Sequence, residues 1–431
     1  MKNALVISVE GVGQNLIGGY GSNTAITPNL DQMIARSFVF DNCYLDSVST
    51  HEQLISLWTS THAFQRGNHP QLQAITQNGD MHVHDELGSA SLWKRVASQG
   101  LQATFLTDSP VAARLAESLG CPEVLLIDVV ENCEAVTDST ECNAAELFWA
   151  AGQWMNSSSR QGLVWIHSRG LNLPWDAPLE LRSQFIDPED PEPPSDVSPP
   201  VLRIDKSTDP DLVVGWGQVA AAQVCILDEA IGSLLQLFSN SPADQSWLQT
   251  VLCLGGVPLG ESGKLGRQVP VPLRQEQLNC AWMVNVPGVL ELGRHRAEIC
   301  QLPDVGESIA NYLIHPAENS GSSNWGRDVL EFETPENSKH WPPHLQLAVT
   351  ESEAEDWVRC PAWSLLRSKD GLNSELFVKP DDRWEVSNIA SRRPDIVDRL
   401  WCLLEEFRKA TLTHQRGNLL ELEEDLCSWM R

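Results

Sequence analysis

The chain has 431 residues, of which 42% are hydrophobic and 20% are charged, a composition typical of a folded soluble protein. Its length suits one large α/β domain and a smaller second one, because single cores rarely grow past roughly 250–300 residues. The 58 acidic and 30 basic residues give a formal net charge of −28, which repels nucleic acid and anionic membrane surfaces. We therefore expect no nucleic-acid partner and no membrane partner.

The apolar run at the N-terminus is too short for a signal peptide. No uninterrupted apolar run elsewhere reaches the length of a membrane span. We therefore expect a cytoplasmic protein. The 11 cysteines include no C-x-x-C pair, so we expect reduced, mostly buried thiols rather than a zinc site or a disulfide framework.

Strand-like apolar runs alternate with amphipathic helical patterns through the first part of the chain, which favours a mostly parallel sheet covered on both faces. A helix should begin at Thr27, with Thr27 as the cap and Pro28 at the first helical position. The predicted strands are 4–9, 38–45, 101–106, 123–130, 162–167 and 246–256. The predicted helices include 27–37, 91–100, 145–155, 219–238 and 305–314.

Two composition changes divide this pattern. Residues 186–200, IDPEDPEPPSDVSPP, are dominated by Pro and acidic residues, which indicates an exposed insertion or lid. Near residue 320 the sequence becomes more polar, and it then contains short strand-like segments and a predicted helix around 394–409. We predict an α/β domain over residues 1–320 and a smaller C-terminal α+β domain, with an antiparallel sheet and a terminal helix, over 321–431.

The order of segments resembles that of the sulfatases in the alkaline-phosphatase-like superfamily. GGYGSNTAITPNLDQMIARSFVFDNCY is similar to the family stretch in which C-Y-G precedes T-P-N-L-D and a helix leads into a strand. Four more family segments have counterparts in the same order: IHSRGLNLPWDAP, LDEAIGSLLQLF, LGGVPLGESGKLGR and ELFVKPDDRWEVSNIA. Together the five segments extend over nearly the whole chain.

This resemblance implies the alkaline-phosphatase/sulfatase-like fold and an activity as a sulfuric ester hydrolase. In the family a divalent cation, usually calcium, is held by two Asp after the first strand and by Asp with Asn or His after a later one. Such a hard cation needs several oxygen ligands. The nucleophile is a formylglycine made from the Cys or Ser of a C/S-x-P-x-R motif.

The metal-ligand positions depart from the family pattern. Glu10 aligns with the first Asp and Gly11 with the second, while Gly255 and Gly256 align with the two ligands of the later loop. One carboxylate and three glycines make a poor calcium site, so we expect Glu10 to be a remnant and no cofactor to be bound. If only the side chains differ, Asp at the first three positions and Asn at the fourth would restore a calcium site.

The nucleophile motif is altered as well. In DSVSTHEQLISLWTS, Thr50 aligns with the modified Cys or Ser, Glu52 with the Pro and Leu54 with the Arg, so no formylglycine is expected. Thr50, His51 and Glu52 could supply a hydroxyl, a base and an orienting acid. Adjacent residues seldom direct their side chains at one another, so the start of a helix is the other interpretation.

Three further residues mark the expected substrate site. His167 lies in the segment IHSRGLNLPWDAP, where Asn172 replaces a substrate-contacting His, and Arg267 replaces the Lys of the family's G-x-x-G-K while keeping its positive charge. Asp108 stands where the family has an active-site Lys. Most of the anion-binding charge is thus expected to be missing.

We predict a sulfatase-like protein that is catalytically inactive or strongly impaired and serves as a binding or regulatory scaffold for an unidentified ligand or protein partner. The alternative is a sulfuric or phosphoric ester hydrolase that uses Thr50 and a non-standard site for calcium or another divalent cation.

Overall fold

The apolar run at the N-terminus forms the central strand of a large sheet. A computed structural model describes residues 2–68, 74–77, 80–83, 87–88, 91–157, 161–239, 246–261, 263–266, 273–289, 293–314, 325–330, 346–413, 416, 419 and 421–428. β1 (Asn3–Glu10) pairs in parallel with β7 (Leu163–Ser168) on one side and with β9 (Trp247–Leu254) on the other. All three strands are largely buried, as parallel strands covered on both faces are.

Five more strands complete this sheet, which has the order β12-β2-β11-β9-β1-β7-β5-β6. β11 alone among the eight is antiparallel to its neighbours. The bounds are β2 (Phe38–Tyr44), β5 (Ala103–Thr107), β6 (Glu123–Leu126), β11 (Asn279–Asn285) and β12 (Arg294–Gln301).

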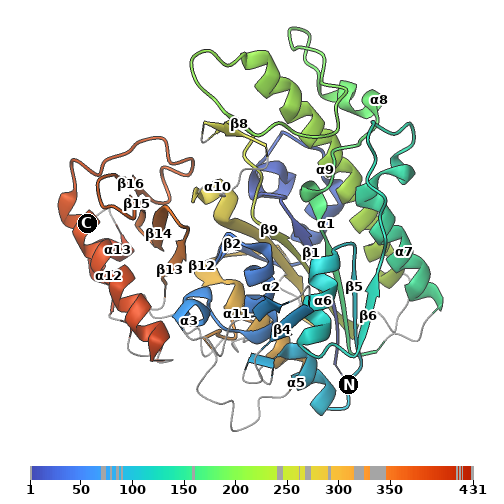
Figure 1. The fold of residues 1–431 in the computed structure, drawn as a ribbon, viewed down its shortest axis with the longest axis horizontal. Coiled ribbons are helices and arrows are strands. Elements are labelled where there is room, and N and C mark those ends of the chain that lie inside the picture. Colours follow the sequence, from blue (N-terminus) through green and yellow to red (C-terminus); the bar gives the residue numbers. More distant parts are fainter. Residues whose placement is uncertain are drawn as a thin grey trace.

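Helices cover both faces of the large sheet (Figure 1). Because successive strand residues point to opposite faces, Leu5 and Ile7 of β1 pack in one core and Ala4 and Val6 in the other. The first core holds α1 (Pro28–Ala35), α7 (Asn143–Ser157) and α9 (Pro210–Ser239). The second holds α2 (Thr50–Thr59), α5 (Leu92–Ser98), α6 (Pro110–Ser118) and α11 (Leu302–Leu313).

Helix α9 has the length and hydropathy of a membrane-spanning helix. By length and composition, Pro210–Phe238 is apolar enough to cross a bilayer. However, 67% of its most apolar window is buried inside the protein, where Val219, Ala220 and Leu227 face the large sheet. This burial is typical of a core helix.

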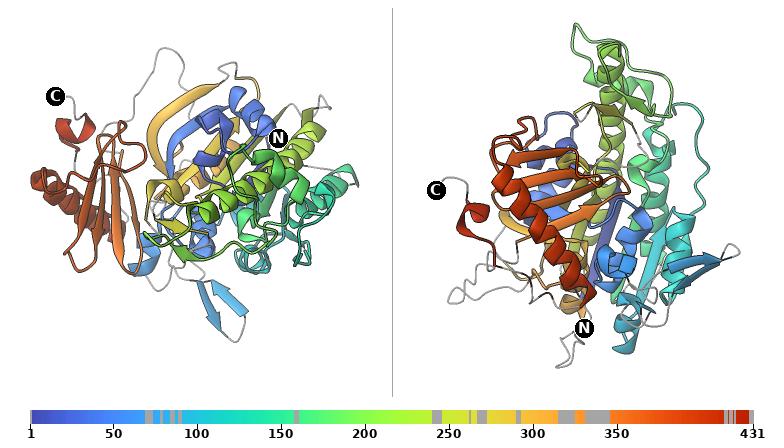
Figure 2. Two further views of the ribbon diagram at one scale, coloured as in Figure 1. Left: turned by 90° about the horizontal axis from the view of Figure 1, so that it is seen from above. Right: turned by 60° about the vertical axis from the view of Figure 1, so that its left-hand side comes forward.

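The C-terminal part forms a small antiparallel sheet with one long helix. Its strands follow one another as a meander, and alternate residues face opposite ways: Trp357 and Leu366 join the core of the large sheet, whereas Val358 and Leu365 pack against the helix. The small sheet thus lies between that helix and the large sheet (Figure 2). The elements are β13 (Ala348–Glu351), β14 (Glu355–Cys360), β15 (Trp363–Ser368), β16 (Ser374–Val378) and α12 (Pro394–Leu412).

Shorter elements connect these layers. They are α3 (Ala63–Asn68), β3 (Ala74–Gln77), β4 (Asp80–Val83), α8 (Leu179–Arg182), β8 (Leu202–Arg203), β10 (Lys264–Leu265), α10 (Gln275–Leu278) and α13 (Glu424–Cys427), together with single 3₁₀ turns such as η5 (Gly170–Asn172).

The predicted fold class is confirmed, and the structure adds detail to several local predictions. Thr27 is the N-cap residue of α1, but its hydroxyl donates to Asp31 at 3.1 Å and makes no capping bond. The Pro-rich segment contains no helix or strand between 187 and 200, yet the buried Arg182 donates to the carbonyl groups of Pro194 and Asp196. Hydrogen bonds therefore hold that segment against the α/β domain.

The domain boundary expected at residue 320 lies outside the described residues. All 11 cysteines are free thiols.

Candidate functional site

The predicted site residues converge at the carboxyl end of the parallel strands, where open α/β sheets usually place their ligands. Glu10 is the last residue of β1, Thr50 is the first of α2, and Asn172 ends the η5 turn that follows β7. They line a cavity of about 90 Å³ together with Gly11, Gly255 and Gly256. Arg267 lies outside the described residues. The structure thus brings six of the predicted residues together around one cavity, whereas His51 and His167 do not line it.

The carboxylate of Glu10 is fully engaged by its surroundings. Its Oε1 atom lies 2.9 Å from Nε2 of His167, and its Oε2 atom accepts hydrogen bonds from Asn172 Nδ2 and, at 3.4 Å, from Thr50 Oγ1. The side chain of Glu10 is 7% exposed and that of His167 is fully buried. A buried carboxylate with this set of donors is satisfied without a metal ion.

The tautomer of His167 follows from a chain of hydrogen bonds behind it. Trp165 Nε1 donates to Ser8 Oγ at 2.9 Å, and Ser8 Oγ lies 3.0 Å from Nδ1 of His167. Because the carboxylate of Glu10 can only accept from Nε2, Nδ1 is left to accept from the serine hydroxyl. The imidazole proton then resides on Nε2 and is donated to Glu10. His167, which was predicted to lie in the substrate site, is buried and holds the carboxylate of Glu10.

The three glycines are closely packed: side chains of Leu171 and Val257 face Gly11, and backbone faces Gly255 and Gly256. Gly11 and Gly255 have φ angles of +80° and +64°, a region that favours glycine. A Cβ atom at Gly255 would lie 2.3 Å from the carbonyl oxygen of Gln277, and one at Gly256 would lie 2.5 Å from that of Glu276. The expectation that Asp and Asn at these positions would restore a calcium site is therefore corrected, because backbone fills the space for a side chain at Gly255 and Gly256.

The segment around Thr50 begins a helix, as the second interpretation of its sequence proposed. Ser49 is the N-cap residue of α2, and Glu52 accepts a hydrogen bond of 2.7 Å from the buried Arg66. Nδ1 of His51 lies 3.5 Å from Ser49 Oγ, and its Nε2 lies 3.8 Å from Glu52. Neither contact is with Thr50, so the arrangement of hydroxyl, base and acid that the first interpretation allowed is not formed.

Positive charge is scarce around the cavity. Among the described residues that line it, none is a lysine or an arginine. Arg169 pairs with Glu131 at 2.7 Å. Asp108, which is 2% exposed, accepts from the backbone N–H of Arg169 at 2.9 Å, and burial raises the pKa of its carboxyl. In the part of the chain that the structure describes, no group of three or more His, Cys, Asp or Glu side chains could hold a metal ion.

Sequence reasoning missed the role of Ser8 and Trp165. The signal was the spacing: Ser8 and Glu10 are two residues apart on β1, and Trp165 and His167 are two apart on β7, so each pair shares a face. The parallel register places Ser8 opposite His167. Polar residues two apart on two adjacent, otherwise apolar strands indicate such a buried network.

This network makes Glu10 important for stability. We expect Glu10→Ala to lower the free energy of unfolding by about 2 kcal/mol, because the buried N–H of His167 loses its acceptor. Glu10→Gln keeps an amide oxygen in its place and should lose less than half as much. Urea unfolding followed by tryptophan fluorescence measures both changes. Equal stability of Glu10→Ala and the parent protein would contradict this role for Glu10.

Comparisons with known proteins place this geometry in a fold family. The sequence matches no family model and no curated protein. Solved structures match almost the whole chain: a phosphonate monoester hydrolase of Agrobacterium radiobacter has a TM-score of 0.71 at 12% identity, with 96% of each chain covered. The phosphonate monoester hydrolase from Silicibacter pomeroyi has a TM-score of 0.71 at 13% identity, with 97% of each chain covered. A 2-O GAG sulfatase has a TM-score of 0.69 at 14% identity, with 99% of this chain and 96% of the other covered.

The chain therefore has the fold of the sulfatases and phosphonate monoester hydrolases of the alkaline-phosphatase-like superfamily. The resemblance drawn from the five sequence segments is confirmed in this respect. Identities of 12–14% establish the fold and leave the activity to be argued from the site itself.

Proposed function

We propose that this protein is a non-hydrolytic member of the sulfatase-like fold, one that serves as a binding or regulatory scaffold rather than as an ester hydrolase. The observation on which this rests is the state of Glu10, whose two carboxylate oxygens are taken by His167, Asn172 and Thr50. A calcium ion would have to displace these donors and would gain a single protein carboxylate.

Two further features support the proposal. The glycines at 11, 255 and 256 supply no side-chain ligand, and backbone carbonyl groups leave no room for one at 255 and 256, so the residues present do not fit the divalent cation that the resemblance implies. The described lining of the cavity also holds no cation to stabilise the charge that develops on a transferring sulfuryl or phosphoryl group. A threonine hydroxyl without a metal ion or a strong base is a weak nucleophile.

The corresponding prediction concerns turnover. The purified protein should hydrolyse an aryl sulfate, an aryl phosphate and an aryl phosphonate no faster than buffer does, with calcium, magnesium or manganese added in turn. Thr50→Ala and the neighbouring Ser49→Ala should give the same background rates. Turnover that depends on added metal and disappears in Thr50→Ala, while Ser49→Ala retains it, would contradict the proposal.

A second candidate function is the ester hydrolase that uses Thr50. The contact that favours it is the hydrogen bond from Thr50 to Glu10, which continues through His167 to Ser8. In that arrangement Glu10 would accept the threonine proton, and the hydroxyl sits at the N-terminus of α2, where partial positive charge stabilises an anion. The turnover assay separates the two candidates.

A further inference from the structure

A second hollow lies between the large sheet and the C-terminal sheet, away from the Glu10 cavity. It has a volume of about 400 Å³ and shares no lining residue with that cavity. β2 contributes Asp41 and Asn42, β14 contributes Arg359, and the segment after β16 contributes Lys379 and Arg383. A hollow of this size accommodates a small organic molecule.

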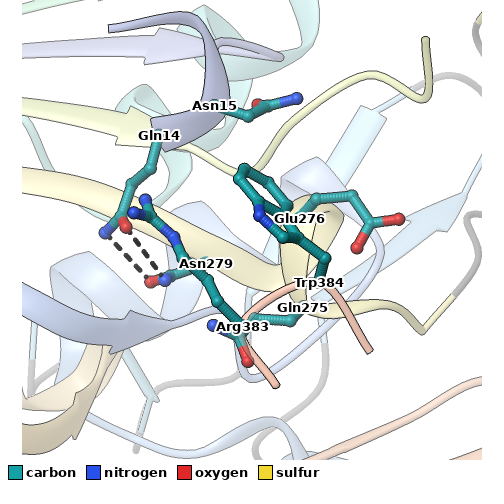
Figure 3. Close-up of a pocket in the computed structure, with 7 residues that line it drawn as sticks. All are labelled: Gln14, Asn15, Gln275, Glu276, Asn279, Arg383 and Trp384. Carbon is teal, nitrogen blue, oxygen red and sulfur yellow. Dashed lines mark hydrogen bonds between the residues drawn. The ribbon is translucent and has the colours of Figure 1, made fainter. Parts of the chain in front are cut away.

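A smaller pocket of about 20 Å³ adjoins the hollow (Figure 3). The two share Gln14, Gln275, Asn279 and Arg383. Gln14 and Asn279 exchange hydrogen bonds of 3.2 and 3.1 Å through their side-chain amides. Figure 3 shows Arg383, from the C-terminal part, beside this amide pair, and all three residues line both pockets.

Two of the cations in the hollow are deeply buried: Arg359 is 4% exposed and Lys379 is 1% exposed. Lys379 Nζ lies 3.3 Å from Glu385 and donates to the carbonyl oxygen of Asp382 at 2.8 Å. Burial lowers the pKa of Lys379 to about 8, and the neighbouring charge of Arg359 acts in the same direction, against the attraction of Glu385.

Arg359, in contrast, has only neutral hydrogen-bond partners. Its Nε donates to the hydroxyl of Tyr44 at 3.3 Å, and its Nη1 donates to the carbonyl oxygen of Trp363 at 3.4 Å. Both distances exceed the usual range for N–H···O bonds. Within the described part of the chain, no carboxylate lies within 4.0 Å of this guanidinium.

The carboxylates nearby are already in use. Glu385 pairs with Lys379 and also accepts from Ser364 Oγ at 2.7 Å and from the backbone N–H of Gln275 at 3.3 Å. Asp41 pairs with His295 at 2.8 Å near the opening. The one buried carboxylate beside the two buried cations thus pairs with Lys379, and Arg359 has no carboxylate partner among the described residues. An uncompensated buried charge is costly, and in a chain with a net charge of −28 it indicates a site for a negative ligand.

We propose that this hollow binds a small organic oxyanion, with its carboxylate, phosphate or sulfate group held by Arg359 and Arg383. The planar guanidinium of Arg359 matches such a group with two parallel N–H donors. Asn42 donates one N–H to the carbonyl oxygen of Ala297 and accepts from Tyr44, so its amide keeps one donor and one lone pair for the rest of the molecule. The site is independent of the proposal made for the Glu10 cavity, since the two cavities have no residue in common.

Thermal unfolding in the presence of citrate, phosphate or sulfate tests the site, with sodium chloride at equal ionic strength as the reference. A ligand that binds only the native state raises the unfolding midpoint. At least one of the three anions should raise the midpoint of the parent protein by about 3 °C or more above the chloride reference. If none does so, the proposal is overturned.

Variants then locate the effect. Arg359→Met keeps the length of the side chain and removes its charge, and it should abolish the anion-dependent rise. Arg367→Met is the matched control, because Arg367 lies on the neighbouring strand β15, outside the hollow, and stacks on Trp401. It should retain the full rise. An undiminished rise in Arg359→Met would overturn the proposal.

If Arg359→Met does not fold, Arg383→Gln gives the same test from an exposed position at the wall of the hollow. It should reduce the rise at least by half, and an unchanged rise would overturn the proposal.

Discussion

Gly255→Asp is expected to lower the free energy of unfolding by about 3 kcal/mol or more and to create no calcium site. The added Cβ would lie 2.3 Å from the carbonyl oxygen of Gln277 and 2.8 Å from Leu45 Cδ1. The φ angle of +64° adds backbone strain. Urea unfolding measures the loss of stability, and calorimetric titration measures calcium binding.

Gly100→Asp is the matched control for this prediction. Gly100 has a similar φ of +71°, but nothing lies within 4 Å of the position of its Cβ, so only backbone strain of about 1 kcal/mol is expected. The difference between the two variants isolates the effect of the backbone around Gly255. Equal losses, or calcium binding by Gly255→Asp, would show that this loop can open to hold a metal ion.

The strands that could be predicted from the sequence are those whose signal is local. β1, β7 and β9 are apolar runs buried on both faces, so their residues alone indicate a central parallel strand. β14 was missed, because its sequence EDWVRC carries charges at buried positions. Asp356 is buried there by ion pairs of 2.6 Å with Lys369 and with Arg408. Such partners lie far along the chain, and no local pattern reveals them.

The candidate site shows the same limit. The alignment with the family singled out Glu10, Thr50, Asn172 and the glycines, which line one cavity in the structure. It could not show that His167 turns to Glu10, because this depends on the register of β1 against β7. Nor could it show that α10 places backbone carbonyl groups against Gly255 and Gly256. The sequence shows that metal-ligand side chains are absent at these glycines. Only the structure shows that backbone atoms fill the space where such side chains would lie at Gly255 and Gly256.

The hollow between the two sheets was not predicted from the sequence. Its cations come from β14 and from the segment after β16, which the sequence assigned to a separate C-terminal domain, and they face β2 of the large sheet. Neither part contains a recognisable anion-binding motif by itself. The unbalanced charge arises only where the two sheets meet, so a site of this kind falls outside the reach of motif comparison.

Acid is expected to destabilise the protein through His62, a fully buried histidine that the sequence did not single out. Its ring packs against Trp325 and Phe407, and its Nδ1 accepts the N–H of Phe64 at 3.1 Å. A proton on Nδ1 would face that donor. Burial, reinforced by the charge of Arg66, lowers the pKa of His62 from 6.5 to about 3.

The direction of the effect follows from linkage. Between pH 6.5 and pH 3 the unfolded chain binds a proton at His62 that the folded protein does not, so stability is lost as the pH falls. Asp46 acts oppositely: burial raises its pKa to about 6, so its contribution to stability rises as the pH falls through this value. The pH-dependent change in the free energy of unfolding of the parent protein is therefore the sum of opposing contributions. A variant of His62 is needed to isolate the contribution of this residue.

Between pH 7.5 and pH 4.5 we expect His62 to lower the free energy of unfolding of the parent protein by about 3 kcal/mol, and His62→Asn should remove this loss. The value follows because pH 4.5 lies two units below the ordinary histidine pKa of 6.5, which corresponds to about 2.7 kcal/mol. The measurement is urea unfolding of parent and variant at both pH values, and the quantity compared is the difference between the two pH values. Lost packing affects both pH values alike and therefore cancels. His51→Asn, at a histidine whose side chain is 34% exposed, should leave the difference as it is in the parent protein. If His62→Asn shows the same pH dependence as the parent, the buried imidazole is not what makes this fold sensitive to acid.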